Sequence, residues 1–324
     1  MKYISISQAL IENNKNFLEI ENTTKLKSLQ YIFKKVTFVG WGRKKSGLWA
    51  TFMGRLTKNR FLLLEDGFIR SFKLGIEGSP SFSIIKDDIG VYYDATSPSK
   101  LEKLLNSYDF KNDKELMAIA KKAKRKIIEY KISKYNNFKN IDLSYLNNSK
   151  KKILIVAQTA GDSSLEYGLG NKFTTQEIIE TAVKDNSHHE IYIKIHPDVL
   201  IGKKRSDIKL NDIPKTCHIL QDNINPIELL KYFDKVYTKT SGMGMEALLL
   251  DKEVYCFGMP FYAGWGVTKD KLVSKRRNRK LTVDEIFAGA YILYSNYYNP
   301  YLNKEADIID IIEYIHKYRN KKNF

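Results

Sequence analysis

The sequence has 324 residues, which predicts about two domains, and its apolar content of 43% is enough to build a packed core in each. Lys and Arg number 54 against 37 Asp and Glu, which gives a net charge of +17 and points to anionic partners. Lys, Asn, Ile and Tyr are all abundant, however, so a compositional bias with solvated surface charge explains the excess equally well. No zinc-finger spacing, RNP-like motif or helix-turn-helix signature supports a nucleic-acid partner.

The two cysteines, Cys217 and Cys256, indicate neither a disulfide scaffold nor a metal cluster, and they fit a reducing cytoplasm. The first 20 residues lack an uninterrupted apolar run with a small-residue cleavage site. No stretch reaches the roughly 18 apolar residues that a spanning helix needs. We therefore expect a cytoplasmic protein that neither spans a membrane nor carries a standard export signal.

In chain order, the first half contains two apolar runs, in segments 36–47 and 60–71, that stop at glycine or at a pair of carboxylates, as strands do at their carboxyl ends. Residues 100–135 repeat apolar side chains at helical spacing among Lys and Glu, which predicts one amphipathic helix or two. Segment 136–152 is rich in Asn, Ser and Lys and is typical of an interdomain linker.

The second half alternates strand, loop and helix more regularly, and this pattern predicts a parallel sheet with crossover helices. The expected strands lie in the segments KILIVAQT, EIYIKIHPD, CHILQDN, KVYTKTSG and EVYCFG. We predict an N-terminal domain over residues 1–145 and a C-terminal domain over 146–324, whose last helix is free to pack back on the first domain. Two such Rossmann-like α/β domains facing across a cleft describe the GT-B fold of many nucleotide-sugar transferases, although a fold alone licenses no function.

Three loops of the second domain follow strands and are expected at one edge of the sheet, where open α/β sheets bind ligands. The first, after the run ILIV, carries Asp162 among small polar residues. The second carries His196 and Pro197, and the third carries Ser241 before an apolar helix whose N-terminus suits a phosphate. Taken singly, each has a structural alternative: a helix cap, an ordinary loop histidine, and a simple turn.

Glu65 and Asp66 stand side by side at the end of an apolar run of the first domain. Neighbouring residues on a strand point to opposite faces, so one is expected to face a cleft and the other to pair with a base such as Arg70. With Asp162, one of them would complete the two carboxylates of retaining glycosyl transfer.

Segment 256–266 is dense in aromatic residues and glycine, and segment 40–47 echoes it; each fits a sugar platform or interdomain packing equally well. The three acids of segment 86–96 lack a convincing set of metal ligands and are interpreted as structural or acceptor-side residues.

With these segments in hand, the chain resembles the KpsC (LipA-type) capsule polysaccharide Kdo transferases. The resemblance rests on eight motifs in family order over about residues 36–300: GWGRKKSG, LEDGFIRS, DDIGVYYDATSPS, SKYN, QTAGDSSLEYG, KIHPDVLIGKK, TSGMGMEALL and CFGMPFYAGWGVT. It implies a GT-B fold, CMP-Kdo as donor, transfer with retention and no metal or other cofactor. It also implies an acceptor that is a Kdo-bearing linker on a phosphatidylglycerol-type lipid. Family members carry two such modules in tandem, whereas this chain contains one, which leaves the linkage (2→4 or 2→7) open.

Carried over to matching positions, the resemblance makes Asp162 the nucleophile and Glu65 or Asp66 the acid/base. It assigns donor binding to the residues of the HP loop and of the TSGMGME segment, which are His196, Pro197, Thr240, Ser241, Gly242 and Glu246. A lower-ranked set for the acceptor or sugar comprises Arg43, Gln158, Tyr262 and Trp265.

Kdo carries a carboxylate on its anomeric carbon, so a nucleophilic aspartate must approach it past like charge, and positive groups are needed to compensate. Lys194, on the same strand face as His196, and Arg43 are the candidates for that role. The basic excess suggests in addition an anionic inner-membrane surface as partner. Two other interpretations stay open: an inverting CMP-sialic-acid-type transferase, and a non-catalytic capsule-export or glycolipid-binding protein.

Overall fold

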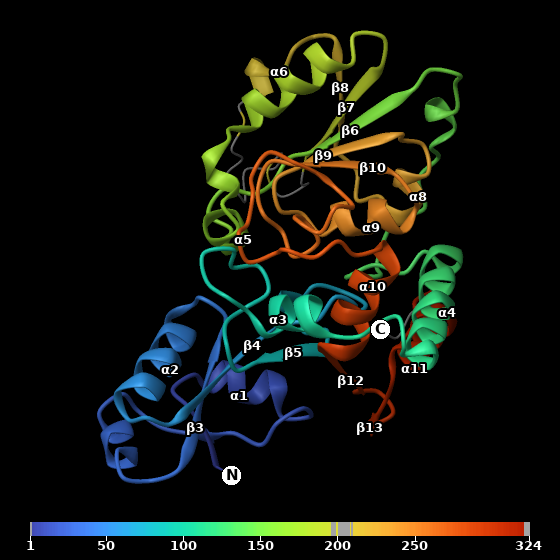
Figure 1. Ribbon diagram of the computed structural model, residues 1–324. Helices are drawn as coiled ribbons and strands as arrows, with labels where there is room; N and C mark the ends of the chain where they lie inside the picture. Colours follow the sequence, from blue (N-terminus) through green and yellow to red (C-terminus); the bar gives the residue numbers. More distant parts are fainter. Residues whose placement is uncertain (1, 196–198, 200–207, 209, 321–324) are drawn as a thin grey trace. The chain divides into compact units, whose positions relative to one another are not determined.

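The computed structural model describes residues 2–195, 199, 208 and 210–320 (Figure 1). The chain divides into two compact units. Unit 1 comprises Met1–Tyr92, Ser97–Asn137 and Phe287–Phe324, and unit 2 comprises Tyr93–Thr96 and Phe138–Ile286. This division differs from the predicted boundary at 145/146 in three ways. Tyr93–Thr96 belongs to unit 2, and the chain passes to unit 2 again at Phe138, eight residues before the predicted start. Everything from Phe287 onward, not only the last helix, belongs to unit 1.

Unit 1 is built on a seven-stranded sheet of order β13-β12-β5-β4-β3-β1-β2. The strands are β1 (Lys2–Ser5), β2 (Glu21–Asn22), β3 (Val36–Trp41), β4 (Arg60–Asp66), β5 (Ser83–Asp87), β12 (Ser295–Asn299) and β13 (Lys304–Glu305). Strands β1 to β4 are parallel, whereas β5, β12 and β13 join antiparallel to their neighbours. The predicted strands at 36–47 and 60–71 are therefore confirmed, and the Rossmann-like part of this sheet ends at β4.

The helices of unit 1 include the amphipathic region predicted over 100–135, which forms two helices, α3 (Lys100–Ser107) and α4 (Lys114–Tyr130). Ser99 and Asp113 cap their N-termini, and each side chain accepts a hydrogen bond from the N–H three residues on. The other helical elements are α1 (Gln8–Asn14), η1 (Lys27–Tyr31), α2 (Lys45–Leu56), η2 (Gly75–Glu77), η6 (Ala288–Leu293) and α11 (Ile308–Tyr318).

The C-terminal segment is tied into unit 1 by polar and aromatic contacts. The hydroxyl of Tyr294 donates to Oδ2 of Asp87 at 2.6 Å, although the two residues are 207 apart in sequence. Helix α11 packs on α4, where Lys126 pairs with Glu313 at 2.5 Å. These contacts explain why β12 and α11 complete the N-terminal unit.

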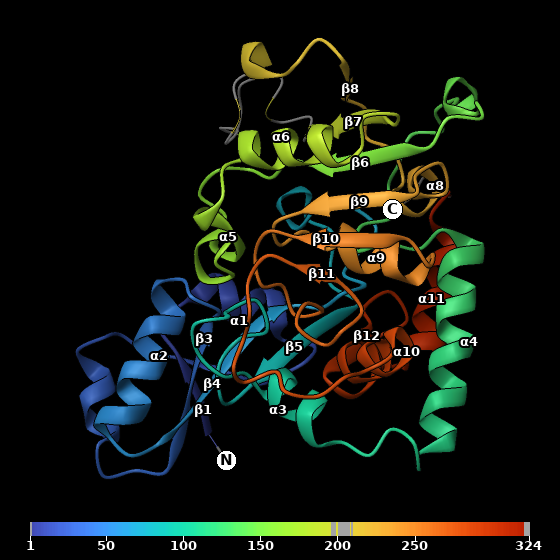
Figure 2. The same cartoon turned by 45° about the horizontal axis from the view of Figure 1, so that its top comes forward.

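Unit 2 is built on the parallel sheet that the sequence predicts, in the order β11-β10-β9-β6-β7-β8 (Figure 2). Its strands are β6 (Lys152–Val156), β7 (Glu190–Lys194), β8 (Cys217–Leu220), β9 (Lys235–Thr238), β10 (Glu253–Cys256) and β11 (Lys269–Asp270). Its helical elements are η3 (Ser144–Leu146), α5 (Ser163–Tyr167), η4 (Gly170–Lys172), α6 (Thr175–Asp185), η5 (Leu210–Asp212), α8 (Pro226–Leu230) and α9 (Met243–Leu249), and α10 (Val283–Phe287) leads into unit 1.

One core cluster of unit 2 lies where α6 covers the sheet. Strand β6 is buried along its whole length, as the continuous apolar run of a central parallel strand predicts. Ile178 and Ile179 of α6 pack there against isoleucines of β6 and β7. Both cysteines are free. No helix among the described residues is long and apolar enough to cross a membrane.

Candidate active site

The order of the strands in unit 2 marks a topological switch point beside β6. From β6 the chain adds β7 and β8 on one side, and then returns to add β9, β10 and β11 on the other. The last residues of the three central strands are in register, because Val156 pairs with both Lys194 and Thr238. Their following loops therefore leave from one edge of the sheet, and the switch point between β6 and β9 is the position at which open α/β sheets bind ligands.

Gln158 joins the two loops that flank this switch point. Its Oε1 accepts a hydrogen bond from the Thr240 backbone N–H at 2.8 Å, and its Nε2 donates to the Thr240 hydroxyl oxygen at 3.0 Å. The Ser164 hydroxyl lies 3.2 Å from the same Thr240 oxygen. Gln158, predicted as a sugar contact, is thus a fixed side chain that holds the β6 loop and the β9 loop together.

Two glycines allow these loops to approach closely. A Cβ on Gly168 would lie 2.8 Å from the Thr240 methyl carbon, and a Cβ on Gly258 would lie 2.8 Å from that carbon and 2.9 Å from the Gly168 carbonyl oxygen. Neither position leaves room for a side chain, so the contact between segments after β6, β9 and β10 depends on both glycines.

The loop after β9 is held by a buried tyrosine. The Tyr262 hydroxyl donates to the Ser241 carbonyl oxygen at 2.6 Å, and the Ser241 hydroxyl oxygen accepts from the Met243 N–H at 3.2 Å. Gly242, the residue before α9, is exposed, whereas Glu246 on that helix is buried. The predicted donor residues Thr240, Ser241 and Gly242 therefore form one ordered turn, and Glu246 lies behind it inside the unit.

Asp162 caps the short helix α5. Its side chain is exposed, and Oδ1 accepts a hydrogen bond from the Ser164 N–H at 2.9 Å. The capping interpretation of this carboxylate is therefore confirmed as a local structural role, at the switch-point edge of the sheet. A cap of this kind also fixes the orientation of the carboxylate.

The second predicted donor loop falls largely outside the described residues, which include neither His196 nor Pro197. Lys194, at the end of β7, is described: its Nζ donates to the Asp222 carbonyl oxygen at 3.2 Å, and burial lowers its pKa. An anion bound beside Lys194 would favour its charged form.

The structure corrects the assignment of Tyr262 and Trp265 to an acceptor or sugar site. Both are buried, the Tyr262 hydroxyl is bonded to Ser241, and the Trp265 Nε1 donates to the Phe261 carbonyl oxygen at 2.8 Å. The guanidinium of Arg277 lies 5.7 Å from the Trp265 ring centroid and donates to two backbone carbonyls nearby. These aromatic side chains build the interior of unit 2 and present no open ring face for a sugar.

The carboxylate pair of unit 1 lies in the last two positions of β4, where Glu65 and Asp66 are both half-buried. Arg70 donates from Nε to Oδ1 of Asp66 at 3.0 Å, as predicted from the sequence. The same guanidinium also donates to the Ser71 hydroxyl and the Ser79 carbonyl oxygen. Asp66 is therefore bound by a well-anchored cation, whereas Glu65 has a different environment.

Glu65 has an unusual pKa. Burial, followed by the charge of Asp66, raises the pKa of Glu65 to about 7, although Lys134 and Lys44 act in the opposite direction. A carboxyl group with this pKa exchanges a proton near neutral pH, as a general acid/base must. Burial likewise raises the pKa of the neighbouring Tyr92 phenol.

Lys134 is the functional candidate to which sequence reasoning gave no role. Burial lowers the pKa of Lys134, but the charges of Tyr92, Asp66, Tyr135 and Glu65 more than offset this, so its pKa lies above the ordinary value and it remains a cation. It belongs to SKYN, one of the motifs on which the family resemblance rests, but no local pattern reveals that this motif lies beside the carboxylates.

Asn136 fixes the SKYN segment against the loop after β4. Its Nδ2 donates to the carbonyl oxygens of Ser71 and Ser133, and its Oδ1 accepts from the Ser133 N–H at 3.0 Å. Ser71 and Tyr135 form a parallel bridge, and the Lys134 carbonyl accepts from the Arg70 N–H at 2.9 Å. The cation of Lys134 is thus attached to the same scaffold as Arg70.

The remaining predicted residues of unit 1 make hydrogen bonds within the unit. Arg43 donates from Nη2 to the Ser97 hydroxyl at 2.6 Å. Asp87 is buried and accepts hydrogen bonds from the N–H groups of Ile89, Gly90 and Lys100 as well as from Tyr294. The structural interpretation of segment 86–96 is confirmed for this residue. In the part of the chain that the structure describes, no group of three or more His, Cys, Asp or Glu side chains is placed to hold a metal ion.

The chain belongs to the capsule polysaccharide biosynthesis protein family, whose model matches residues 37–299. It is 38% identical to the capsule polysaccharide modification protein LipA of Neisseria meningitidis over 294 residues, which cover 88% of this chain and 42% of the relative. It is 37% identical over 246 residues to the lipopolysaccharide-processing protein LpsZ of Rhizobium meliloti, which covers 76% of this chain and 56% of that protein. The chain therefore spans about half the length of these curated relatives or less.

Two solved structures of Thermosulfurimonas dismutans KpsC match 98% of this chain and 98% of their own. The β-Kdo 2,4 transferase has 39% sequence identity and a TM-score of 0.88. The β-Kdo 2,7 transferase has 27% identity and a TM-score of 0.75. The GT-B-like α/β fold with two Rossmann-like units is thereby confirmed, and the likeness to each of these structures extends over almost the whole of this chain.

Proposed function

We propose that this chain is a retaining glycosyltransferase module that moves Kdo from CMP-Kdo to a Kdo-terminated glycolipid acceptor, without a metal or other cofactor. The observation that carries the proposal is the match along almost the whole chain to the β-Kdo 2,4 transferase of KpsC. Because this match exceeds the match to the 2,7 transferase in both identity and TM-score, the proposal includes a 2→4 linkage.

In the proposed first step, a carboxylate oxygen of Asp162 attacks the anomeric carbon of Kdo, and the bond from that carbon to the CMP phosphate breaks. Kdo is then held as an ester of Asp162, and CMP leaves with the bonding electron pair. A phosphate is a good leaving group, so it needs an anion site more than a proton. We assign that site to Thr240, Ser241 and Gly242, together with His196 and Pro197, which follow β7 in the sequence.

In the second step, the acceptor hydroxyl gives its proton to Glu65 while its oxygen attacks the anomeric carbon and releases the Asp162 carboxylate. The pKa of about 7 suits Glu65 to this exchange, and the bond from Arg70 to Asp66 leaves Asp66 the less suitable base. Two displacements at one carbon restore its configuration, which is why the product retains it. Lys194 and Arg43 are the proposed counter-charges for the Kdo carboxylate.

The proposal also places the protein in the cytoplasm, at the anionic face of the inner membrane, because its acceptor is a lipid and its net charge is +17. The decisive experiment incubates the purified protein with a Kdo-terminated acceptor and either CMP-Kdo or CMP-sialic acid. We expect product only from CMP-Kdo, with retained configuration and a 2→4 linkage by NMR. Product from CMP-sialic acid with inversion would favour the sialyl-type transferase, and binding without turnover would favour the glycolipid-binding protein.

A further inference from the structure

Large apolar side chains are exposed on one part of unit 1 far more than elsewhere. Of the twelve exposed large hydrophobic residues in the described chain, seven lie between residues 26 and 56. They are Leu26, Leu29, Ile32, Phe33, Leu48, Phe52 and Leu56, and we call them the apolar face. The exposed fraction is 98% for Phe33, 79% for Leu26 and 61% for Phe52, so these side chains stand in solvent. The remaining five are scattered singly, which is ordinary for a protein surface.

The apolar face is produced by two helical elements that share one core. On α2, Leu48, Phe52 and Leu56 recur every four residues and form a stripe, while Trp49, Ala50 and Met53 point into the core. Around the 3₁₀ turn η1, Leu26, Leu29 and Ile32 recur every three residues, which aligns side chains in a 3₁₀ helix.

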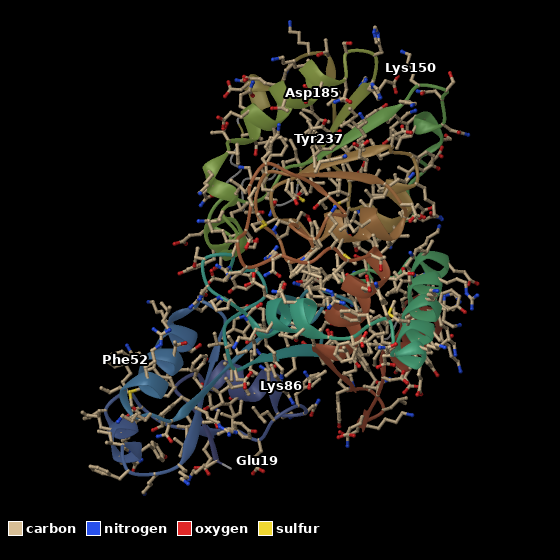
Figure 3. The ribbon with its side chains drawn as sticks, viewed as in Figure 1. Glu19, Phe52, Lys86, Lys150, Asp185 and Tyr237 are labelled. Atoms are coloured by element: carbon tan, nitrogen blue, oxygen red, sulfur yellow. The ribbon has the colours of Figure 1, made fainter. Side chains whose placement is uncertain are left out.

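The inward side chains of the same two elements pack together. Tyr31 of η1 lies in one core cluster with Trp49 and Met53 of α2. The Ser28 hydroxyl lies 3.9 Å from the Met53 sulfur. Residues 24–35 lie beside α2 in both ribbon views (Figures 1 and 2), and Phe52 points outward from the helix (Figure 3). The apolar stripes of η1 and α2 are therefore fixed relative to each other by a shared core.

The segment that forms the apolar face carries charge of one sign. Between Asn22 and Leu64 the sequence has no Asp or Glu and ten basic residues, which are Lys25, Lys27, Lys34, Lys35, Arg43, Lys44, Lys45, Arg55, Lys58 and Arg60. All of them except Arg43 are exposed. Helix α4 is also rich in Lys, but it contains Glu115 and Glu129 and has no exposed large apolar side chain, so it lacks this combination.

We propose that the apolar face and its surrounding basic side chains dock this protein on an anionic lipid surface. Apolar side chains enter the boundary between headgroups and acyl chains, while Lys and Arg contact the anionic headgroups. A nucleic acid would use the cations but would leave Leu26, Leu29 and Ile32 without a partner. This docking surface specifies which residues bind the membrane. It rests on the proposed function only for the purpose of membrane binding, which is access to a lipid acceptor.

The test is flotation of the full chain with vesicles of phosphatidylcholine alone or mixed with phosphatidylglycerol, without donor or acceptor. We expect binding to the mixed vesicles only, and weakening as salt is raised. Phe33→Ser/Phe52→Ser and Lys34→Glu/Lys35→Glu should each lower the vesicle partition coefficient by roughly tenfold or more. The matched controls are Val273→Ser, which removes an exposed apolar side chain of unit 2, and Lys121→Glu/Lys122→Glu, which makes the same charge change on α4; both should bind like the wild type.

Three outcomes would overturn the docking surface: equal binding to neutral and mixed vesicles, equal loss in the control variants, or no vesicle binding. Sedimentation equilibrium tests a second copy as occupant, and a dimer that Phe33→Ser/Phe52→Ser dissociates, with no vesicle binding, would also overturn it. Failure here is distinguishable from failure of the proposed reaction, because transfer to a water-soluble Kdo acceptor is measured separately. A protein that transfers Kdo yet ignores vesicles contradicts only the docking surface.

Discussion

Arg70 donates from its Nε to Oδ1 of Asp66 at 3.0 Å, and this bond gives the two adjacent carboxylates of β4 different chemistry. Asp66 is held by a cation that is itself anchored to Ser71 and Ser79. Glu65 lies beside the charge of Asp66 in a half-buried position, and its pKa is raised to about 7. The pair thus separates into a structural carboxylate and one that exchanges a proton near neutral pH.

We expect Glu65 to control how transferase activity depends on pH. As a base it must be ionised, so kcat should rise with pH through about 7 in the wild type. Glu65→Gln should remove this rise and lower kcat by roughly a hundredfold or more. The measurement is a pH profile of kcat at saturating donor and acceptor, with exposed Glu129→Gln as control. A rise near pH 7 that persists in residual Glu65→Gln activity would exclude Glu65 as its origin.

The same group should make the folded protein less stable as pH rises. Glu65 has a pKa of about 7 when folded and 4.5 as the ordinary value, so the folded state binds the extra proton between these limits. Its stabilising effect is complete below about pH 4.5 and is lost as pH rises through 7. In urea unfolding, the free energy of unfolding of Glu65→Gln should therefore increase relative to that of the wild type as pH rises from 4.5 to 8. We expect this relative increase to be on the order of 1–3 kcal/mol. If the difference in unfolding free energy between Glu65→Gln and the wild type stays the same across this pH range, the pKa of Glu65 is not raised.

Lys134 should set where the activity profile lies on the pH axis. Its positive charge lowers the pKa of Glu65, so Lys134→Met should move the rise in kcat to higher pH. Lys134→Arg keeps the charge and should stay close to the wild-type midpoint. Lys139→Met removes an exposed lysine outside this cluster and controls for the net charge. A midpoint that moves equally in Lys134→Met and Lys139→Met, or not at all, would show that Lys134 does not act on Glu65.

Local sequence was sufficient to pair one of the two carboxylates with Arg70, though not to say which, and to predict the parallel sheet of unit 2. The first depends on a short spacing and the second on apolar strands. Local sequence was insufficient for Lys134, whose place depends on a contact between Asn136 and Ser71, 65 residues apart. The pairing of β12 with β5 is likewise a contact between residues distant in sequence, and the hydrogen bond from Tyr294 to Asp87 stabilises it. Composition alone also left Trp265 ambiguous, because a segment rich in aromatic residues and glycine suits an interior as well as a sugar platform.

Gln158 should matter for donor binding through Thr240. Gln158→Leu keeps the approximate size but leaves the Thr240 N–H without its acceptor, so unfolding free energy should fall by about 1–3 kcal/mol. The KM for CMP-Kdo should also rise, because the β9 loop loses its tie to the β6 loop. Gln8→Leu, at an exposed glutamine of α1, is the matched control. Loss of stability with an unchanged KM would restrict Gln158 to a structural role.

The Asp162 side chain is both a helix cap and the proposed nucleophile. Loss of the second role should lower turnover by orders of magnitude more than loss of the first. Loss of a cap costs about 0.5–2 kcal/mol of stability, whereas loss of a nucleophile abolishes most turnover. Asp162→Asn retains an oxygen that can accept from the Ser164 N–H but is a poor nucleophile, so it should fold normally and be nearly inactive. Asp307→Asn makes the same change at the cap of α11 and should remain active.

Intact-protein mass spectrometry separates the two roles of Asp162 further. With CMP-Kdo and no acceptor, the wild type should gain the mass of one Kdo residue, because the ester on Asp162 forms without an acceptor to discharge it. Asp162→Asn should lack this adduct, while Glu65→Gln should accumulate it, since its proposed defect lies in the second step. An adduct on Asp162→Asn, or substantial turnover by that variant, would place the nucleophile elsewhere and leave Asp162 as the cap of α5 alone.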